Sequence, residues 1–85
     1  MLERGRVVKS LAGRDCGKLL TVIEADEKTA LVCDGKERPV DRPKRKNVRH
    51  LFSLDLILDE ETITRNKALK KALSQAEINC DKQEG

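Results

Sequence analysis

Aromatic residues are almost absent from this sequence, and their scarcity excludes several kinds of binding site. Phe52 is the one aromatic residue among 85, and Trp and Tyr do not occur. A cage for methylated lysine and a groove for proline-rich peptides each need several rings, so both sites are excluded. Stacking on aromatic side chains also needs exposed rings, and we expect Phe52 to be buried. The interior should consist of Val, Leu, Ile and Ala, which leaves no large pocket for a small-molecule substrate.

Metal ligands and catalytic side chains are few as well. Cys16, Cys33 and Cys80 stand far apart without a Cys-x-x-Cys pair, and His50 is the one histidine. A closed zinc site needs four ligands, which this chain hardly supplies, so we expect no metal and no cofactor. His50 and Asp55 are candidates for acid–base chemistry, but no nucleophile accompanies them, and we expect no enzymatic activity.

Long apolar runs are missing too. The sequence has no stretch of about 18 apolar residues and no signal peptide. Its cysteines are odd in number and widely spaced, which is not the pattern of a disulfide framework. We therefore expect a cytoplasmic protein with free thiols and no membrane contact.

Positive charge is concentrated in one segment, although the net charge is only +3. Residues 35–50 carry seven basic and two acidic side chains, whereas residues 1–34 are balanced and residues 51–85 have a small acidic excess. A local excess of this kind is typical of a surface that contacts polyanions.

Short β-branched and aliphatic runs predict five strands in the first 58 residues. The predicted strands are Arg6 to Lys9, Leu19 to Glu24, Thr29 to Cys33, Lys36 to Val40, and His50 to Phe52 with a continuation to Leu58 left open. Asp34-Gly35 predicts a tight hairpin turn before the fourth strand. Pro39 and Pro43 lack an N–H, so this strand should be a short edge strand, followed by an extended basic loop over residues 41–49. Five short strands predict a closed or nearly closed small barrel.

The period of the apolar residues changes to a helical one after residue 59. Ile63, Leu69, Ala72, Leu73 and Ala76 fall on one helical stripe. We therefore divide the chain into a barrel over residues 1–59, one short helix over 60–76 and a disordered tail over 77–85. The helix is expected to dock on the barrel or, alternatively, to pair with another protein, because a helix this short is marginal alone.

Several of these runs together resemble the KOW motif. The matching residues are Gly5-Arg6-Val7-Val8, the run Gly13-Arg14-Asp15-Cys16-Gly17-Lys18-Leu19-Leu20, Val22-Ile23, and Ala30-Leu31-Val32-Cys33-Asp34-Gly35. With the later segment His50-Leu51-x-x-Leu54-Asp55, residues 3–59 resemble the eukaryotic and archaeal large-subunit ribosomal protein family numbered fourteen-e and its short bacterial relatives. The resemblance implies an SH3-like barrel of the KOW type and, as partner, ribosomal or other structured RNA. Its structural glycines would be Gly5, Gly13, Gly17 and Gly35, and we expect Gly17 to be the least replaceable.

Basic side chains are the candidate RNA contacts. They are Arg14, Lys18, Lys36, Arg38, Arg42, Lys44, Arg45, Lys46, Arg49 and His50. Arg binds phosphate through a planar fork and Lys as a point charge, so such a set suits phosphates, 2′-hydroxyls and RNA shape. The function expected is ribosome-associated or ribosome-assembly RNA binding, with ribosomal proteins as further partners. The alternatives are a solvated charge run and a protein-binding adaptor of the transcription or translation machinery.

Overall fold

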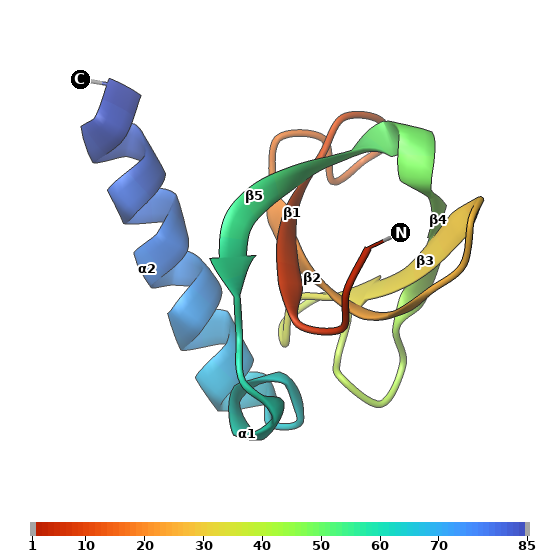
Figure 1. The fold of residues 1–85 in the computed structure, drawn as a ribbon. Helices are drawn as coiled ribbons and strands as arrows, with labels where there is room; N and C mark the ends of the chain where they lie inside the picture. The colour runs from red at the N-terminus through yellow and green to blue at the C-terminus, as the bar shows by residue number, and fades with distance from the viewer. Residues whose placement is uncertain (1, 85) are drawn as a thin grey trace.

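Five strands form one antiparallel sheet in the computed structural model, which describes residues 2–84 and their side chains as far as residue 78. The strands are β1 (Arg6–Ser10), β2 (Leu19–Ala25), β3 (Thr29–Cys33), β4 (Lys44–Asn47) and β5 (Leu51–Ile57). Their order is β4-β3-β2-β1-β5, and a turn of 3₁₀-helix, η1 (Val48–His50), joins the two edge strands. The sheet curls into a ring (Figure 1), although within residues 2–84 no ladder pairs β4 with β5. The predicted mainly β, SH3-like fold is confirmed, as an open rather than a closed barrel.

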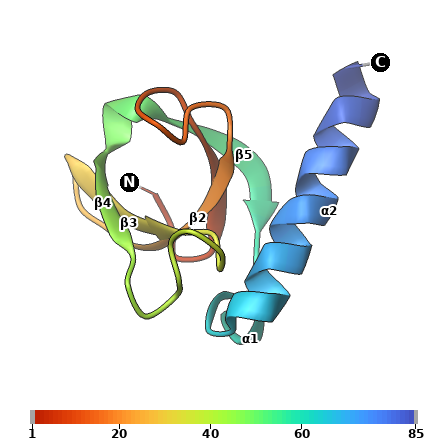
Figure 2. The same cartoon turned by 180° about the vertical axis from the view of Figure 1, so that it is seen from behind.

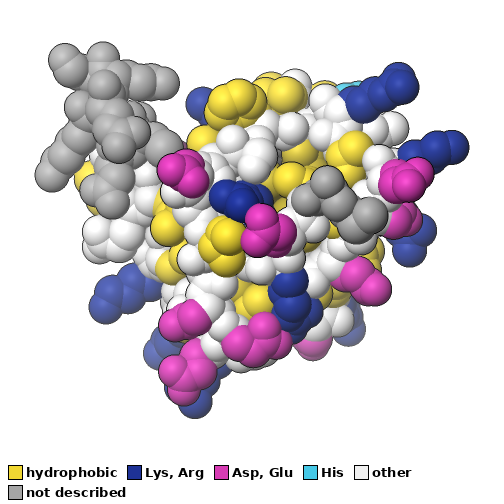
Figure 3. Space-filling model, in the orientation of Figure 1, with side chains coloured by type: hydrophobic (Ala, Val, Ile, Leu, Met, Phe, Trp, Pro, Cys, Tyr) yellow, Lys and Arg dark blue, Asp and Glu magenta, His cyan; other side chains and the backbone are white. Residues whose placement is uncertain are grey.

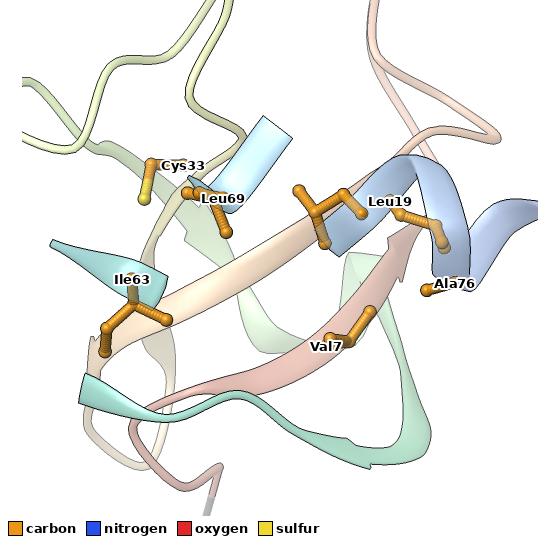
Figure 4. Packing of buried hydrophobic residues seen from close by; sticks show 7 residues of the cluster. Val7, Leu19, Cys33, Ile63, Leu69 and Ala76 are labelled. Atoms are coloured by element: carbon orange, nitrogen blue, oxygen red, sulfur yellow. The ribbon is translucent and has the colours of Figure 1, made fainter. Parts of the chain in front are cut away.

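Two apolar clusters lie on opposite sides of this sheet because successive residues of a strand point to opposite faces. Val8 belongs to the cluster on the concave side, together with Leu20, Val22, Ala30 and Val32. Its neighbour Val7 belongs to the second cluster, which also holds Leu19, Cys33 and four helical residues, Ile63, Leu69, Leu73 and Ala76 (Figure 4). The second cluster joins the helical region to the outside of the barrel.

The helical region is two helices, not the single one predicted. Helix α1 (Glu60–Ile63) begins at Asp59, whose carboxylate accepts the Thr62 N–H at 2.9 Å. It ends at Thr64, and α2 (Asn66–Glu84) begins two residues later. The backbone of α2 is helical to Glu84, beyond the helix end predicted at residue 76, and the disorder of the tail stays a prediction. The side chain of Cys80 lies outside the described residues. Within residues 2–84, no helix has both the length and the apolar character needed to cross a membrane.

The predicted fourth strand, Lys36 to Val40, is a loop, and β4 lies later, in the segment predicted to be the basic loop. The cause is Asp34, whose carboxylate accepts the N–H groups of Lys36 and Arg38 at 2.9 Å each. These local bonds occupy donors that a strand would give to its neighbour. The connection between β3 and β4 is thus a long loop over residues 34–43, not a tight hairpin turn.

Candidate nucleic-acid interface

Three of the predicted basic side chains converge on one hollow of the surface. The hollow has a volume of about 220 Å³ and is lined by Arg14, Asp15, Leu20, Asp34, Glu37, Arg38 and Lys44. Arg14 comes from the loop over residues 11–18, Arg38 from the loop over residues 34–43, and Lys44 from the start of β4. Figure 2 shows these two loops from behind, loop 11–18 in orange above and loop 34–43 in yellow-green below. Segments distant in sequence therefore bring three cations to one place.

Loop 11–18 is held in one conformation by backbone hydrogen bonds. The Gly17 N–H donates to Ser10 O at 2.7 Å, and the Ser10 N–H donates to Lys18 O at 2.9 Å, so the two ends of the loop are joined. Gly13 and Gly17 have φ values of +89° and +88°, a backbone region that other residues rarely adopt. Apart from its chain neighbours, no atom of the described chain lies within 4 Å of a Cβ built on Gly17, so its positive φ, and not a close contact, requires glycine there.

A buried ion pair fastens this loop to β4. Lys46 Nζ lies 2.8 Å from Asp15 Oδ1 and 2.9 Å from Ala12 O, and the Lys46 side chain is only 7% exposed. Ser10 Oγ donates to the same Asp15 oxygen at 2.8 Å. Burial raises the pKa of the Asp15 carboxyl, but the hydrogen bonds from Lys46 and Ser10 outweigh this and hold that pKa below its ordinary value. Lys46 thus has almost no surface to offer to RNA and instead positions loop 11–18.

Loop 34–43 is fastened at its other side to the beginning of α2. The Val40 N–H donates to Asn66 Oδ1 at 2.7 Å, and Gly35, with φ +79°, lies against the Asn66 backbone. Together with the two bonds to the Asp34 carboxylate, these contacts fix the backbone that carries Arg38. The second wall of the hollow is therefore as well defined as the first.

Lys18 and Lys36 lie beside the hollow rather than in it. They line a groove of about 260 Å³ between the barrel and α2, together with Lys70, Glu37 and Glu77 among others. The carboxylate of Glu37 lies 3.4 Å from Lys18 Nζ, and both side chains are more than half exposed. Lys18 is thus already paired with an acid, which makes it a weaker candidate than the cations of the hollow, for which the described residues provide no such partner.

The remaining predicted contacts are spread over other parts of the surface. Arg45 lies on the opposite face of β4 from Lys44 and Lys46. There it lines a different pocket, together with Glu24 and Asp26. Arg42 is exposed at a turn of loop 34–43, and its N–H donates to Pro39 O at 2.9 Å. Arg49 and His50 are exposed in η1. The ten candidates therefore do not form one continuous basic face.

Phe52 is exposed, which contradicts the prediction that it is buried. It is 56% exposed on β5, and the register places it directly opposite the exposed Lys9 of β1. The face shown in Figure 3 carries exposed hydrophobic side chains along its upper edge, with Lys or Arg on either side, and mixes both charges elsewhere. The core has no aromatic residue because two aliphatic clusters already fill both sides of the sheet.

No protein-family model matches the chain, whereas comparison with known proteins does find similarity to a ribosomal protein. The large ribosomal subunit protein eL14 of Staphylothermus marinus is 26% identical to it over 76 residues, which are 88% of this chain and 79% of that protein. The chain is similar to a ribosomal protein. The alignment is longer than residues 3–59, so it includes part of the helical region as well as the barrel. It supports the predicted resemblance to that ribosomal protein family, whereas the KOW motif stays a prediction.

Two features of this interface were missed by sequence reasoning. Lys9 sits in an aliphatic strand, and only the strand register brings it beside Phe52. Asp34 and Glu37 line the hollow, although only the positive charge of their segment had pointed to a binding site. Asp34-Gly35 was interpreted as a turn signal, but that signal does not show that the Asp34 side chain lines the hollow. Among the described residues, no three His, Cys, Asp or Glu side chains gather closely enough to hold a metal ion.

Proposed function

We propose that the protein binds structured RNA, with ribosomal RNA as the first candidate, through the hollow and the cations around it. The observation that carries this proposal is the convergence of Arg14, Arg38 and Lys44 on one hollow between two fastened loops. Two guanidinium forks and one ammonium group suit successive phosphates of a folded strand. Because the loops are already held, little further ordering is needed when RNA binds, and this favours affinity.

The acids in the hollow already have other hydrogen-bond or ion-pair partners. The Asp34 carboxylate already accepts two backbone N–H groups, and the Asp15 carboxylate is paired with Lys46. Glu37 is the exposed acid of the set, and its ion pair is with Lys18 of the neighbouring groove. Among the described residues no carboxylate pairs with Arg14, Arg38 or Lys44, so their donor groups are available to an incoming phosphate.

The similarity to a large-subunit ribosomal protein supports a role on the ribosome or in its assembly. We place this role in the cytoplasm, with ribosomal proteins as further neighbours, and regard loop 11–18 as the KOW-type loop of the barrel. The role proposed is binding rather than catalysis.

A salt titration tests whether the hollow contacts phosphates. We would measure binding of a labelled RNA hairpin at several salt concentrations for the protein and for the triple variant R14Q/R38Q/K44Q. Each phosphate that is no longer neutralised should reduce the slope of log affinity against log salt by about 0.7 to 0.9, so the slope of the variant should be smaller by roughly 2 to 3. The matched control is R65Q/K67Q/K71Q, which removes three exposed cations from the helical region and should keep the slope.

Either of two results would contradict the proposal. In the first, the hollow variant binds with the affinity and slope of the unchanged protein. In the second, the unchanged protein binds with no response to salt, which is the behaviour expected of an adaptor that uses an apolar contact.

A further inference from the structure

Phe52 is the most exposed large hydrophobic side chain that the structure describes. Its exposed fraction of 56% exceeds that of Leu11, Ile78 and Ile57, which range from 51% down to 48%. The ring sits on the part of β5 that pairs with β1, where Leu51, Phe52 and Ser53 lie opposite Ser10, Lys9 and Val8, so its backbone is held by the ladder. A flat apolar surface is therefore presented to solvent from a rigid strand.

Basic residues lie across from this ring and just before it in the chain. Lys9 is its direct partner across the β1–β5 ladder. Arg49 and His50 precede it in η1, and both are exposed. The Leu11 N–H donates to His50 O at 2.8 Å, so the first residue of loop 11–18 lies beside η1. That loop also carries Arg14 into the hollow, so a single loop connects the surroundings of the ring with the hollow.

We propose that Phe52 is a stacking platform for one unpaired base of the bound RNA, while Lys9 and Arg49 contact the phosphates next to it. This inference rests on the proposed RNA binding and adds a single-stranded element to it. Every base has a face that can stack on a ring, so the platform selects unpaired nucleotides and not a sequence. The RNA would then run from the hollow across loop 11–18 to β5.

An RNA occupant fits this surface better than a protein does. The centre of a protein interface is depleted of charged residues, because their desolvation is costly. Here the ring has a lysine opposite it and two basic residues just before it in the chain, whereas the exposed Ile57 lies at the far end of β5. Phosphates on either side of a stacked base would pair with these cations, and an apolar protein surface would leave them without partners.

The test uses two probes, an RNA hairpin with an unpaired loop and a fully paired duplex of the same length. Phe52→Ala should weaken hairpin binding by about 5- to 150-fold, the usual loss for one stacked base, with the salt slope unchanged. Duplex binding should change little. Ile57→Ala is the matched control, because it removes a similarly exposed side chain from the same strand.

A second variant reports stacking directly. The chain has no Trp or Tyr, so Phe52→Trp introduces its single strong fluorophore at the platform. Its emission should be quenched by the hairpin and not by the duplex, and its affinity should equal or exceed that of the unchanged protein.

The outcomes separate this inference from the proposed function. Normal hairpin binding by Phe52→Ala, with weakened binding by R14Q/R38Q/K44Q, would overturn the platform and leave RNA binding standing. Equal losses on hairpin and duplex, or no quenching of the Trp, would also overturn it. A failure of the unchanged protein to bind either RNA would remove the proposed function itself, and the platform with it.

Discussion

The ion pair between Lys46 and Asp15 is the one salt bridge of the described chain whose partners are both largely buried, with side chains 7% and 13% exposed. Lys46→Met should therefore lower the free energy of unfolding by about 3 kcal/mol or more, because it leaves a carboxylate buried without its cation. Urea denaturation measures this change. Arg45→Met, one residue earlier and on the exposed side of β4, should change stability by less than about 0.5 kcal/mol. Equal effects of the two substitutions would contradict the positioning role of Lys46.

Cys33 gives a prediction for alkaline pH. Burial, followed by the charge of Asp34, raises the pKa of the Cys33 thiol from 9.0 to about 11. The thiol of the unfolded chain ionises first, so stability is intact below pH 9 and is lost as the pH rises toward 11, by about 2 kcal/mol. Cys33→Ala should remove this component of the pH dependence in denaturation curves between about pH 8 and 11. A pH profile that stays the same in the variant would show that the thiol is not its source.

At the scale of single elements, β1, β2 and β3 were predictable from sequence. Each is a mainly aliphatic run whose residues contribute to both apolar clusters. The segment after β3 was not predictable from propensity. The side chain of Asp34 diverts the backbone into local bonds, and pairing with β3 then selects the charged residues Lys44–Asn47 as a strand. The break between α1 and α2 was also missed, because the apolar stripe continues through it.

The glycines give a prediction at this scale. Gly17 was expected to be the least replaceable, yet the space around it is open, whereas a Cβ on Gly35 would meet the backbone of Asn66 and, at 3.1 Å, that of Lys70. Gly17→Ala should cost about 1 to 2 kcal/mol for its positive φ alone. Gly35→Ala should cost more, because α2 must also move. Thermal denaturation of both variants ranks them, and the reverse order would be contrary to the structure.

At the scale of the whole molecule, the barrel over residues 1–59 shares an apolar cluster with the helices that follow it, so we expect the two parts to fold together. Ile63, Leu69 and Leu73 cover one side of the sheet, and each contributes about 2 kcal/mol by burial. Their sum is comparable with the net stability of a small domain. A chain ending at residue 59 should therefore lose cooperative unfolding, as measured by circular dichroism. A sharp transition near that of the full chain would show that the barrel is independent.

The candidate site was predictable as a composition but not as an arrangement. The excess of positive charge lies in residues 35–50, and two of the residues that line the hollow, Arg38 and Lys44, belong to this segment. The pleat of β4 turns Arg45 to the other side, and burial removes Lys46 from the surface. Arg14 joins the hollow only through the folded contact between loop 11–18 and β4. Charge counts carry no information about these directions.

The most direct test of RNA binding through the hollow is crosslinking in cells followed by sequencing of the bound RNA, with R14Q/R38Q/K44Q and R65Q/K67Q/K71Q compared with the unchanged protein. We expect enrichment of defined ribosomal RNA helices for the unchanged protein and the helix variant, and none for the hollow variant. Enrichment that survives in the hollow variant would contradict the site, and no enrichment in any of the three proteins would contradict the proposed function.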